Sequence, residues 1–197
     1  MNTLKAEKRS MDVKAKKLRR EGYVTGNLFG REIEGSIPLK FTKKEIEVLL
    51  KNNNKGSQVM LELDGKTYDA LIKEVDYNPL AGGIDEIDFQ ALVSNEMVHS
   101  TAEIILENEE KVMSGVLQDE LKEVAYKALP ADLVDKIKVD VAGMKIGDTL
   151  RVKDLEIAKN KNIHITTDPE AVVATVTPVH NVVPETETEA EETAEEK

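Results

Sequence analysis

The chain has 197 residues, enough for one large domain or two small ones, and 40% are hydrophobic but only 4% aromatic, which favours strand-based cores of Val, Ile and Leu. It has no cysteine, which excludes disulfides and zinc–thiolate sites, and no apolar run near the roughly 20 residues that span a bilayer, so we expect a cytoplasmic protein without a membrane partner. Its net charge of −11 argues against nucleic acid as a partner unless the charges are unevenly distributed.

The first 20 residues are strongly basic. They hold eight Lys and Arg against Glu7 and Asp12, and the run from Lys14 to Arg20 is the densest part. Charge stands where a secretory signal needs its apolar stretch, so we expect no such signal. Cations packed this densely repel one another unless they face a polyanion, which suggests RNA or DNA binding. A solvated N-terminal arm is the alternative, and composition leaves both open.

A helix and a hairpin are predicted next. Thr42 and Glu45 have the spacing of a capping box, and the amphipathic run behind them predicts a short helix to about Lys51. Asp64 and Gly65 then separate two segments of alternating hydrophobicity. Because both residues tolerate the positive φ of a type I′ turn, they predict a β-hairpin.

A further strand completes the first half. Asn78-Pro79 and Gly82-Gly83 mark a turn, and residues 84–89 behind it alternate as a strand does. A helix and a hairpin among strands predict a compact, mostly β first domain over residues 1–94.

The second half predicts another mostly β domain, over residues 95–180. Its expected strands are residues 102–106, 137–141, a turn entering a strand over 143–150, and 172–177. Residues 116–121 are predicted to form one short helix.

The last segment, residues 181–197, is acidic. From Pro184 onward it holds seven Glu against one Lys and no large apolar side chain. Such a segment cannot offset the entropy cost of ordering, so we expect a disordered tail.

Catalytic patterns are weak throughout the chain. The histidines His99, His164 and His180 are scattered without metal-ligand spacing, and Asp85-Glu86 with Asp88 is a cluster expected by chance among 38 acidic residues. No nucleophile elbow, zinc motif or dinucleotide fingerprint is present. We therefore expect a protein that is not an enzyme, with no cofactor and no small-molecule substrate.

A series of short motifs carries a family resemblance. In chain order they are Lys16–Gly22, Leu28–Gly30, Ile37–Leu39, Asn78-Pro79, Ile87–Phe89, Ser114–Gln118, Ala128–Asp132, Val139–Gly143, Ile146–Leu150 and Thr167–Ala174. Each is weak alone, but together and in this order they are specific. The chain resembles the long, two-domain form of the bacterial large-subunit ribosomal protein number twenty-five, the Ctc general stress protein family.

The resemblance implies a mostly β (α+β) fold: a small N-terminal β-barrel with short helices, then a second mostly β domain. It implies a structural component of the large ribosomal subunit that binds 5S ribosomal RNA through the barrel and meets neighbouring large-subunit components. The RNA-binding residues that it implies are Arg9, Lys14, Lys16, Lys17, Arg19, Arg20, Asn27, Phe29, Lys73, Tyr77 and Asp88.

Departures from the family pattern bear on the RNA contact. Shorter members often carry Gln, Arg and His at the positions of Asp76, Tyr77 and Glu86. Carboxylates at two of these positions are expected to repel phosphate and weaken the contact. Two other functions stay open: a stress-linked module that binds RNA or protein off the ribosome, and a carboxylate-dependent hydrolase.

Overall fold

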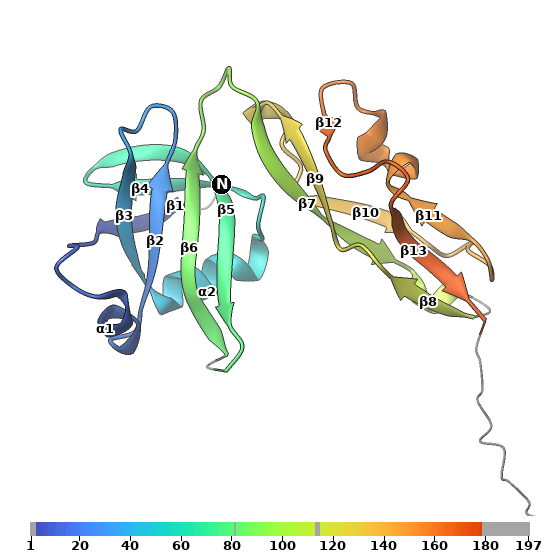
Figure 1. Ribbon diagram of the computed structural model, residues 1–197, viewed down its shortest axis with the longest axis horizontal. Coiled ribbons are helices and arrows are strands. Elements are labelled where there is room, and N and C mark those ends of the chain that lie inside the picture. Colours follow the sequence, from blue (N-terminus) through green and yellow to red (C-terminus); the bar gives the residue numbers. More distant parts are fainter. Residues whose placement is uncertain (1–2, 81, 113–114, 179–197) are drawn as a thin grey trace, which may run out of the picture.

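The computed structural model describes residues 3–80, 82–112 and 115–178 (Figure 1). These residues are mostly β with two short α-helices, which confirms the predicted fold class. Within them, no helix has the length and apolar character needed to cross a membrane. The predicted disordered tail, residues 181–197, lies outside the described residues.

The first half folds as a closed six-stranded barrel. Its strands are β1 (Thr3–Lys8), β2 (Tyr23–Phe29), β3 (Ser36–Thr42), β4 (Gln58–Leu63), β5 (Lys66–Asn78) and β6 (Gly83–Ala91), in the order β1-β3-β2-β6-β5-β4. The pairs β1–β4 and β2–β6 are parallel and the others antiparallel. Because β4 pairs back onto β1, none of these six strands has a free edge.

The barrel interior follows from strand alternation. Every second residue points inward, and the buried side chains include Leu28, Leu39, Ile72 and the two rings of Phe41 and Phe89. The ring centroids of Phe41 and Phe89 lie 5.5 Å apart at an interplanar angle of 56°, a favourable tilted arrangement. A core of aliphatic side chains around one aromatic pair agrees with the aromatic-poor composition.

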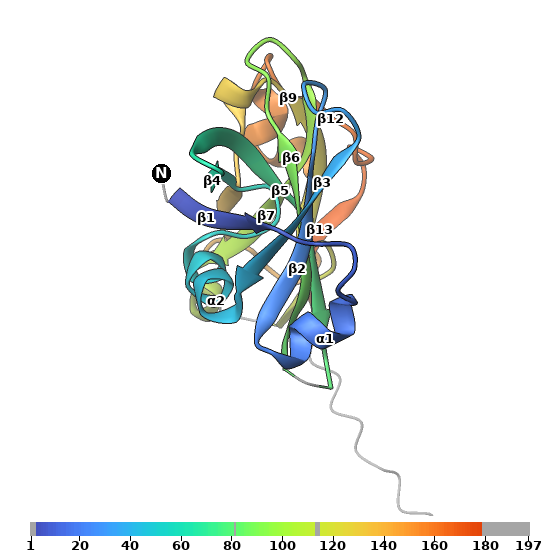
Figure 2. The same ribbon diagram turned by 90° about the vertical axis from the view of Figure 1, so that its left-hand side faces the viewer.

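Two helices lie outside the barrel strands. The predicted helix is confirmed as α2 (Lys43–Asn52), where the Thr42 side chain accepts a hydrogen bond from the Glu45 amide and the Glu45 side chain accepts one from Thr42. The basic run forms a second helix, α1 (Ala15–Arg20), beside β2 (Figure 2). Leu18 is its buried residue. The basic run is therefore a helix on the barrel wall rather than a solvated arm.

The predicted hairpin is also confirmed. It joins β4 to β5, with Leu63 paired to Lys66 across the turn. Asp64 has φ 50° and Gly65 φ 76°, the positive values that a type I′ turn requires at both central residues.

Residues 98–112 and 115–178 of the second half form two open sheets and four short 3₁₀ turns. One sheet has the order β10-β7-β9-β12 and the other β11-β13-β8. The strands are β7 (Val98–Glu107), β8 (Val116–Asp119), β9 (Glu123–Ala128), β10 (Lys136–Asp140), β11 (Thr149–Arg151), β12 (His164–Ile165) and β13 (Val172–Thr177). The turns are η1 (Glu109–Lys111), η2 (Pro130–Asp132), η3 (Val152–Asp154) and η4 (Glu156–Lys159). The strands expected around residues 102–106, 137–141, 150 and 172–177 are all present.

The short helix predicted over residues 116–121 is wrong. Residues 116–119 form strand β8, which pairs antiparallel with β13 from Val116–Thr177 to Asp119–Ala174. Leu117 is the residue of this strand that packs against the core, and a single apolar contact does not distinguish a short strand from a helical turn. The long-range pairing supplies backbone hydrogen bonds that a single helical turn cannot.

Polar contacts connect the two halves. Lys55 lies 3.7 Å from Glu123, and Ser57 donates a hydrogen bond to Asp135 at 3.3 Å. Asn54 donates to the Glu103 carboxylate. The last barrel strand ends at Ala91 and β7 begins at Val98. The division of the chain at residue 94 stays a prediction.

Candidate nucleic-acid interface

Helix α1 and the residue before it present four cations to solvent. Lys14, Lys16, Lys17 and Arg20 are exposed, while Leu18 anchors the helix to the barrel. The only ion pair given by one of these four among the described residues joins Lys17 to Glu21, at 3.9 Å. Such an exposed pair stabilises little, so the four positive charges remain available to a ligand.

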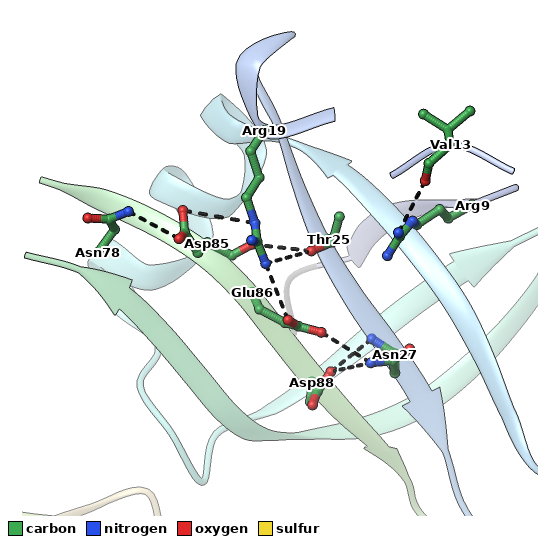
Figure 3. A network of polar contacts seen from close by, with 9 residues as sticks. All are labelled: Arg9, Val13, Arg19, Thr25, Asn27, Asn78, Asp85, Glu86 and Asp88. Atoms are coloured by element: carbon green, nitrogen blue, oxygen red, sulfur yellow. Dashed lines mark hydrogen bonds and ion pairs between the residues drawn. The ribbon is translucent and has the colours of Figure 1, made fainter. Parts of the chain in front are cut away.

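Arg19 points the other way, onto the barrel wall, and its side chain is 32% exposed (Figure 3). Its Nε donates a hydrogen bond to the backbone carbonyl of Asp85 at 3.1 Å. Its Nη2 donates to Thr25 Oγ1 and to Glu86 Oε2, both at 3.4 Å. Arg19 therefore links α1 to β2 and β6.

Asn27 continues this set of contacts along β2 (Figure 3). Its side-chain amide donates to Asp88 at 3.1 Å and to Glu86 at 3.3 Å, and its backbone amide donates to Asp88 at 2.9 Å. We call Arg19, Thr25, Asn27, Asp85, Glu86 and Asp88 the Arg19 network.

The register of two parallel strands creates the Arg19 network. Thr25 lies opposite Glu86, and Asn27 lies opposite Asp88. Since alternate residues share a face, these side chains all lie outside the barrel. Gly26 lets the strands approach closely, because a Cβ there would lie 2.0 Å from the carbonyl oxygen of Ile87.

Arg9 and Phe29 lie at the ends of this region. Arg9 donates from Nη2 to the Val13 carbonyl at 3.2 Å, across the loop between β1 and α1. Its buried Nε has no hydrogen-bond partner among the described residues. Phe29 is the last residue of β2 and is half-buried, opposite Gln90.

Lys73 and Tyr77 are outside the Arg19 network, on β5. Lys73 donates from Nζ to the backbone carbonyl of His99 in the second half, at 2.8 Å. Burial lowers the pKa of Lys73, and repulsion from Lys55 lowers it further. The Tyr77 side chain is 65% exposed, and it lines a hollow together with Lys55 and Glu103.

Comparisons with known proteins match both halves of the chain. The Ribosomal L25p family model matches residues 4–89, and the model of the ribosomal protein TL5 C-terminal domain matches residues 97–180. A large ribosomal subunit protein bL25 from Caldanaerobacter subterraneus is 31% identical over 196 residues, 98% of this chain and 98% of the relative. The chain belongs to the bL25 family. The bL25 protein of Carboxydothermus hydrogenoformans is 32% identical over 190 residues, 92% of this chain and 94% of that one.

Membership in the bL25 family confirms the resemblance drawn from the short motifs, in its long, two-domain form. The structure brings three of the implied RNA-binding residues, Arg19, Asn27 and Asp88, into one network. It arranges Lys14, Lys16, Lys17 and Arg20 beside that network. Lys73 and Tyr77 lie toward the second half of the chain.

Sequence reasoning missed the roles of Thr25 and Asp85 in this bL25-family member. Thr25 stands two residues before Asn27, the spacing of one strand face, and that signal was available. Asp85 contributes mainly its backbone carbonyl to Arg19, and no residue type signals such a role. Glu86 accepts hydrogen bonds from Arg19 and Asn27, and its repulsion of phosphate stays a prediction.

The carboxylates of the Arg19 network do not form a metal site. Across residues 3–80, 82–112 and 115–178, no group of three or more His, Cys, Asp or Glu side chains could hold a metal ion. Asp85 accepts a hydrogen bond from Asn78 at 3.1 Å, and Glu86 and Asp88 accept from Asn27. These side chains are arranged for hydrogen bonding and ion pairing.

Proposed function

We propose that this chain binds 5S ribosomal RNA, with α1 and the outer face of β2 and β6 in contact with the RNA. The coarser function follows from the family: bL25 proteins are large ribosomal subunit proteins, so the chain has a structural, ribosome-associated role in the cytoplasm. Its relatives' family points to no enzymatic activity. The identity of the RNA and the contact residues are the proposed part.

The observation that carries the proposal is the set of exposed cations on α1. Lys14, Lys16, Lys17 and Arg20 lie on a short helix anchored by Leu18. Cations fixed on a folded element can meet successive phosphates without first losing much conformational freedom. Each phosphate that they neutralise releases condensed counterions, which supplies most of the salt-dependent affinity for nucleic acid.

The face beside α1 supplies the other groups that RNA recognition uses. Asn27 is held in place by Asp88, and Phe29 follows it on β2. Irregular RNA helices present a wide minor groove with 2′-hydroxyls, and unpaired bases can stack on rings. In the proposed complex, Arg9 holds the loop that leads into α1, and Tyr77 and Lys73 on β5 form the margin of the surface.

The second half has a different proposed partner. It shows no basic helix like α1 among residues 98–112 and 115–178, and we propose that it meets neighbouring components of the large subunit. The hydrogen bond from Lys73 to His99 would help to fix the orientation of the second half relative to the barrel.

A titration of the full chain against 5S RNA, with transfer RNA as competitor, tests the proposed function. Selective binding is expected, with an affinity for 5S RNA that falls with salt but stays above the affinity for transfer RNA. Equal affinity for both RNAs at every salt concentration would contradict the proposal, because it would reduce the contact to generic polyanion binding.

A further inference from the structure

Glu86 is an acidic side chain at the centre of the proposed RNA surface. It lies on β6 opposite Thr25 of β2, beside α1, and its side chain is 33% exposed, so a ligand can reach it. A carboxylate at this place repels a phosphate that approaches it. The surface therefore combines a cationic helix with an acidic centre.

The contacts of Glu86 also change what Arg19 offers to a ligand. The Arg19 guanidinium lies 3.4 Å from Glu86 and donates to the Asp85 carbonyl and to Thr25. Its charge is partly neutralised before any RNA arrives. Lys16 and Arg20 lie one helical turn or less from Arg19. They form no ion pair within the described part of the chain, so they keep their charge for phosphate.

RNA differs from a simple polyanion in the hydrogen-bond donors that it presents. Ribose 2′-hydroxyls and the amino group of guanine line the minor groove, and a carboxylate is an acceptor for such donors. A generic chain of phosphates offers nothing to Glu86. An RNA of fitting shape can place a donor there while its phosphates lie against α1.

We infer that Glu86 is a specificity-determining residue for RNA binding. Because it masks Arg19 and repels phosphate, it lowers the affinity for generic polyanions more than the affinity for an RNA that presents hydrogen-bond donors to it. This inference rests on the proposed function, since it requires the face of β2 and β6 to meet RNA. It predicts that removing the charge of Glu86 raises affinity but lowers selectivity.

The variant Glu86→Gln in the full chain tests the inference, because it keeps the side-chain size and removes the charge. Three probes are titrated: 5S RNA, transfer RNA and inorganic polyphosphate, which is a polyanion without such donors. Affinity for polyphosphate and transfer RNA should rise by about fivefold, and affinity for 5S RNA by less than about twofold. Thermal unfolding of the variant shows whether the fold is retained.

The matched control is Glu62→Gln. Glu62 lies on β4, which is opposite β2 in the closed strand order, and this change removes the same charge far from the proposed surface. It should change all three affinities slightly and equally, through net charge alone.

A second background tests the masking of Arg19. In Arg19→Ala, the further change Glu86→Gln should give a smaller gain for polyphosphate than in the wild type, because it relieves direct repulsion but no longer frees the Arg19 guanidinium. This non-additivity is the expected sign of two side chains that act together. An unchanged gain would show that Glu86 acts without Arg19 and would overturn the masking part of the inference.

The outcomes separate the two proposals. Suppose that the wild type selects 5S RNA, but that Glu86→Gln, like Glu62→Gln, changes the affinities for all three probes by the same factor. The inference about Glu86 is then overturned and the proposed function stands. If the wild type binds 5S RNA and transfer RNA equally, the proposed function fails and the inference falls with it.

Discussion

The barrel and the second domain pair their strands in different ways. The barrel closes β4 onto β1, so each of its six strands has two neighbours. The second domain has two open sheets, whose described edge strands are β10, β12, β11 and β8. Unpaired strand edges can accept a further strand. A closed barrel is therefore suited to binding through its side chains, and the open sheets retain backbone groups for protein contacts.

The two domains also differ in their charge. Residues 1–94 contain 16 Lys and Arg against 15 Asp and Glu, whereas residues 95–180 contain 10 against 16. The basic excess of the barrel is small overall, but it is concentrated around α1. Local placement matters more than the total because exposed charges more than about 10 Å apart are largely screened at 0.1 M salt. The acidic second domain is the poorer partner for RNA.

The largest expected effect comes from the barrel core. Phe89 is fully buried against Phe41, so Phe89→Ala should destabilise the barrel by about 3–5 kcal/mol through lost burial and a residual cavity. Urea unfolding followed by circular dichroism measures the loss. The barrel transition should move while that of the second domain stays in place. A single transition that moves as a whole would show that the two domains unfold together.

The second prediction concerns the cations of α1. The triple variant Lys16→Ala, Lys17→Ala and Arg20→Ala should lower the salt slope of RNA binding by about three, since each cation neutralises about one phosphate. The unfolding midpoint should barely change, because these side chains are exposed. Lys136→Ala, Lys138→Ala and Lys159→Ala in the second domain are the matched control. An unchanged slope in the α1 variant would move the RNA contact to another face.

A smaller effect is expected in the core of the second domain. Tyr126 is fully buried, and its hydroxyl donates to the Val134 carbonyl at 2.6 Å and accepts from the Val134 amide at 2.8 Å. Tyr126→Phe removes both bonds and should cost about 1–3 kcal/mol. The urea transition of the second domain should fall while RNA affinity is retained. A loss of RNA affinity in a folded variant would show that the domains are coupled.

Local patterns predicted much of the fold. The capping box at Thr42 and the Asp64-Gly65 turn depend on residues three or fewer apart, and both form as expected. The strand over residues 172–177 was also predicted, because a short run rich in Val and Thr is typical of a strand. The misassigned segment at residues 116–119 shows the limit, since its pairing with β13 lies about 60 residues away.

The candidate site was predicted less well than the fold. The basic run was visible in the sequence. The burial of Leu18 and the contacts of Arg19 with the outer wall of the barrel depend on β2 and β6. Asn27 and Asp88 meet across 61 positions because two parallel strands share a register. Nothing in the sequence indicated that the Nζ of Lys73 contacts the His99 carbonyl, and the role of Lys73 in RNA binding stays a prediction. Such contacts arise only when distant segments assemble.

A modest loss is expected at the cap of α2. The Thr42 hydroxyl accepts from the Glu45 amide at 3.4 Å, so Thr42→Ala should destabilise the barrel by about 1 kcal/mol. Thr42→Ser, which keeps the hydroxyl, is the control and should restore most of the stability. Urea midpoints of the three proteins measure the effect. Equal losses for both variants would mean that the Thr42 methyl group matters more than the cap.

The smallest effect is a pH dependence confined to the second domain. A hydrogen bond from Lys153, at 2.8 Å, lowers the pKa of Glu170, and Arg151 lowers it further. A carboxylate whose pKa is lower in the folded state contributes stability above its unfolded pKa, and loses it as the pH falls through the folded value.

Glu170→Gln should therefore lower the melting temperature slightly at pH 7. The difference should shrink as the pH falls from the ordinary value of 4.5 through the lower folded pKa. Because the pair is exposed, added salt should shrink the difference as well. Lys153→Met should cause a smaller loss, because it leaves the Arg151–Glu170 pair in place, and the losses of Lys153→Met and Glu170→Gln should not add, since both remove the Lys153–Glu170 contact. A difference between wild type and Glu170→Gln that does not shrink at all on acidification would show that the amide disturbs packing rather than removing an ion pair.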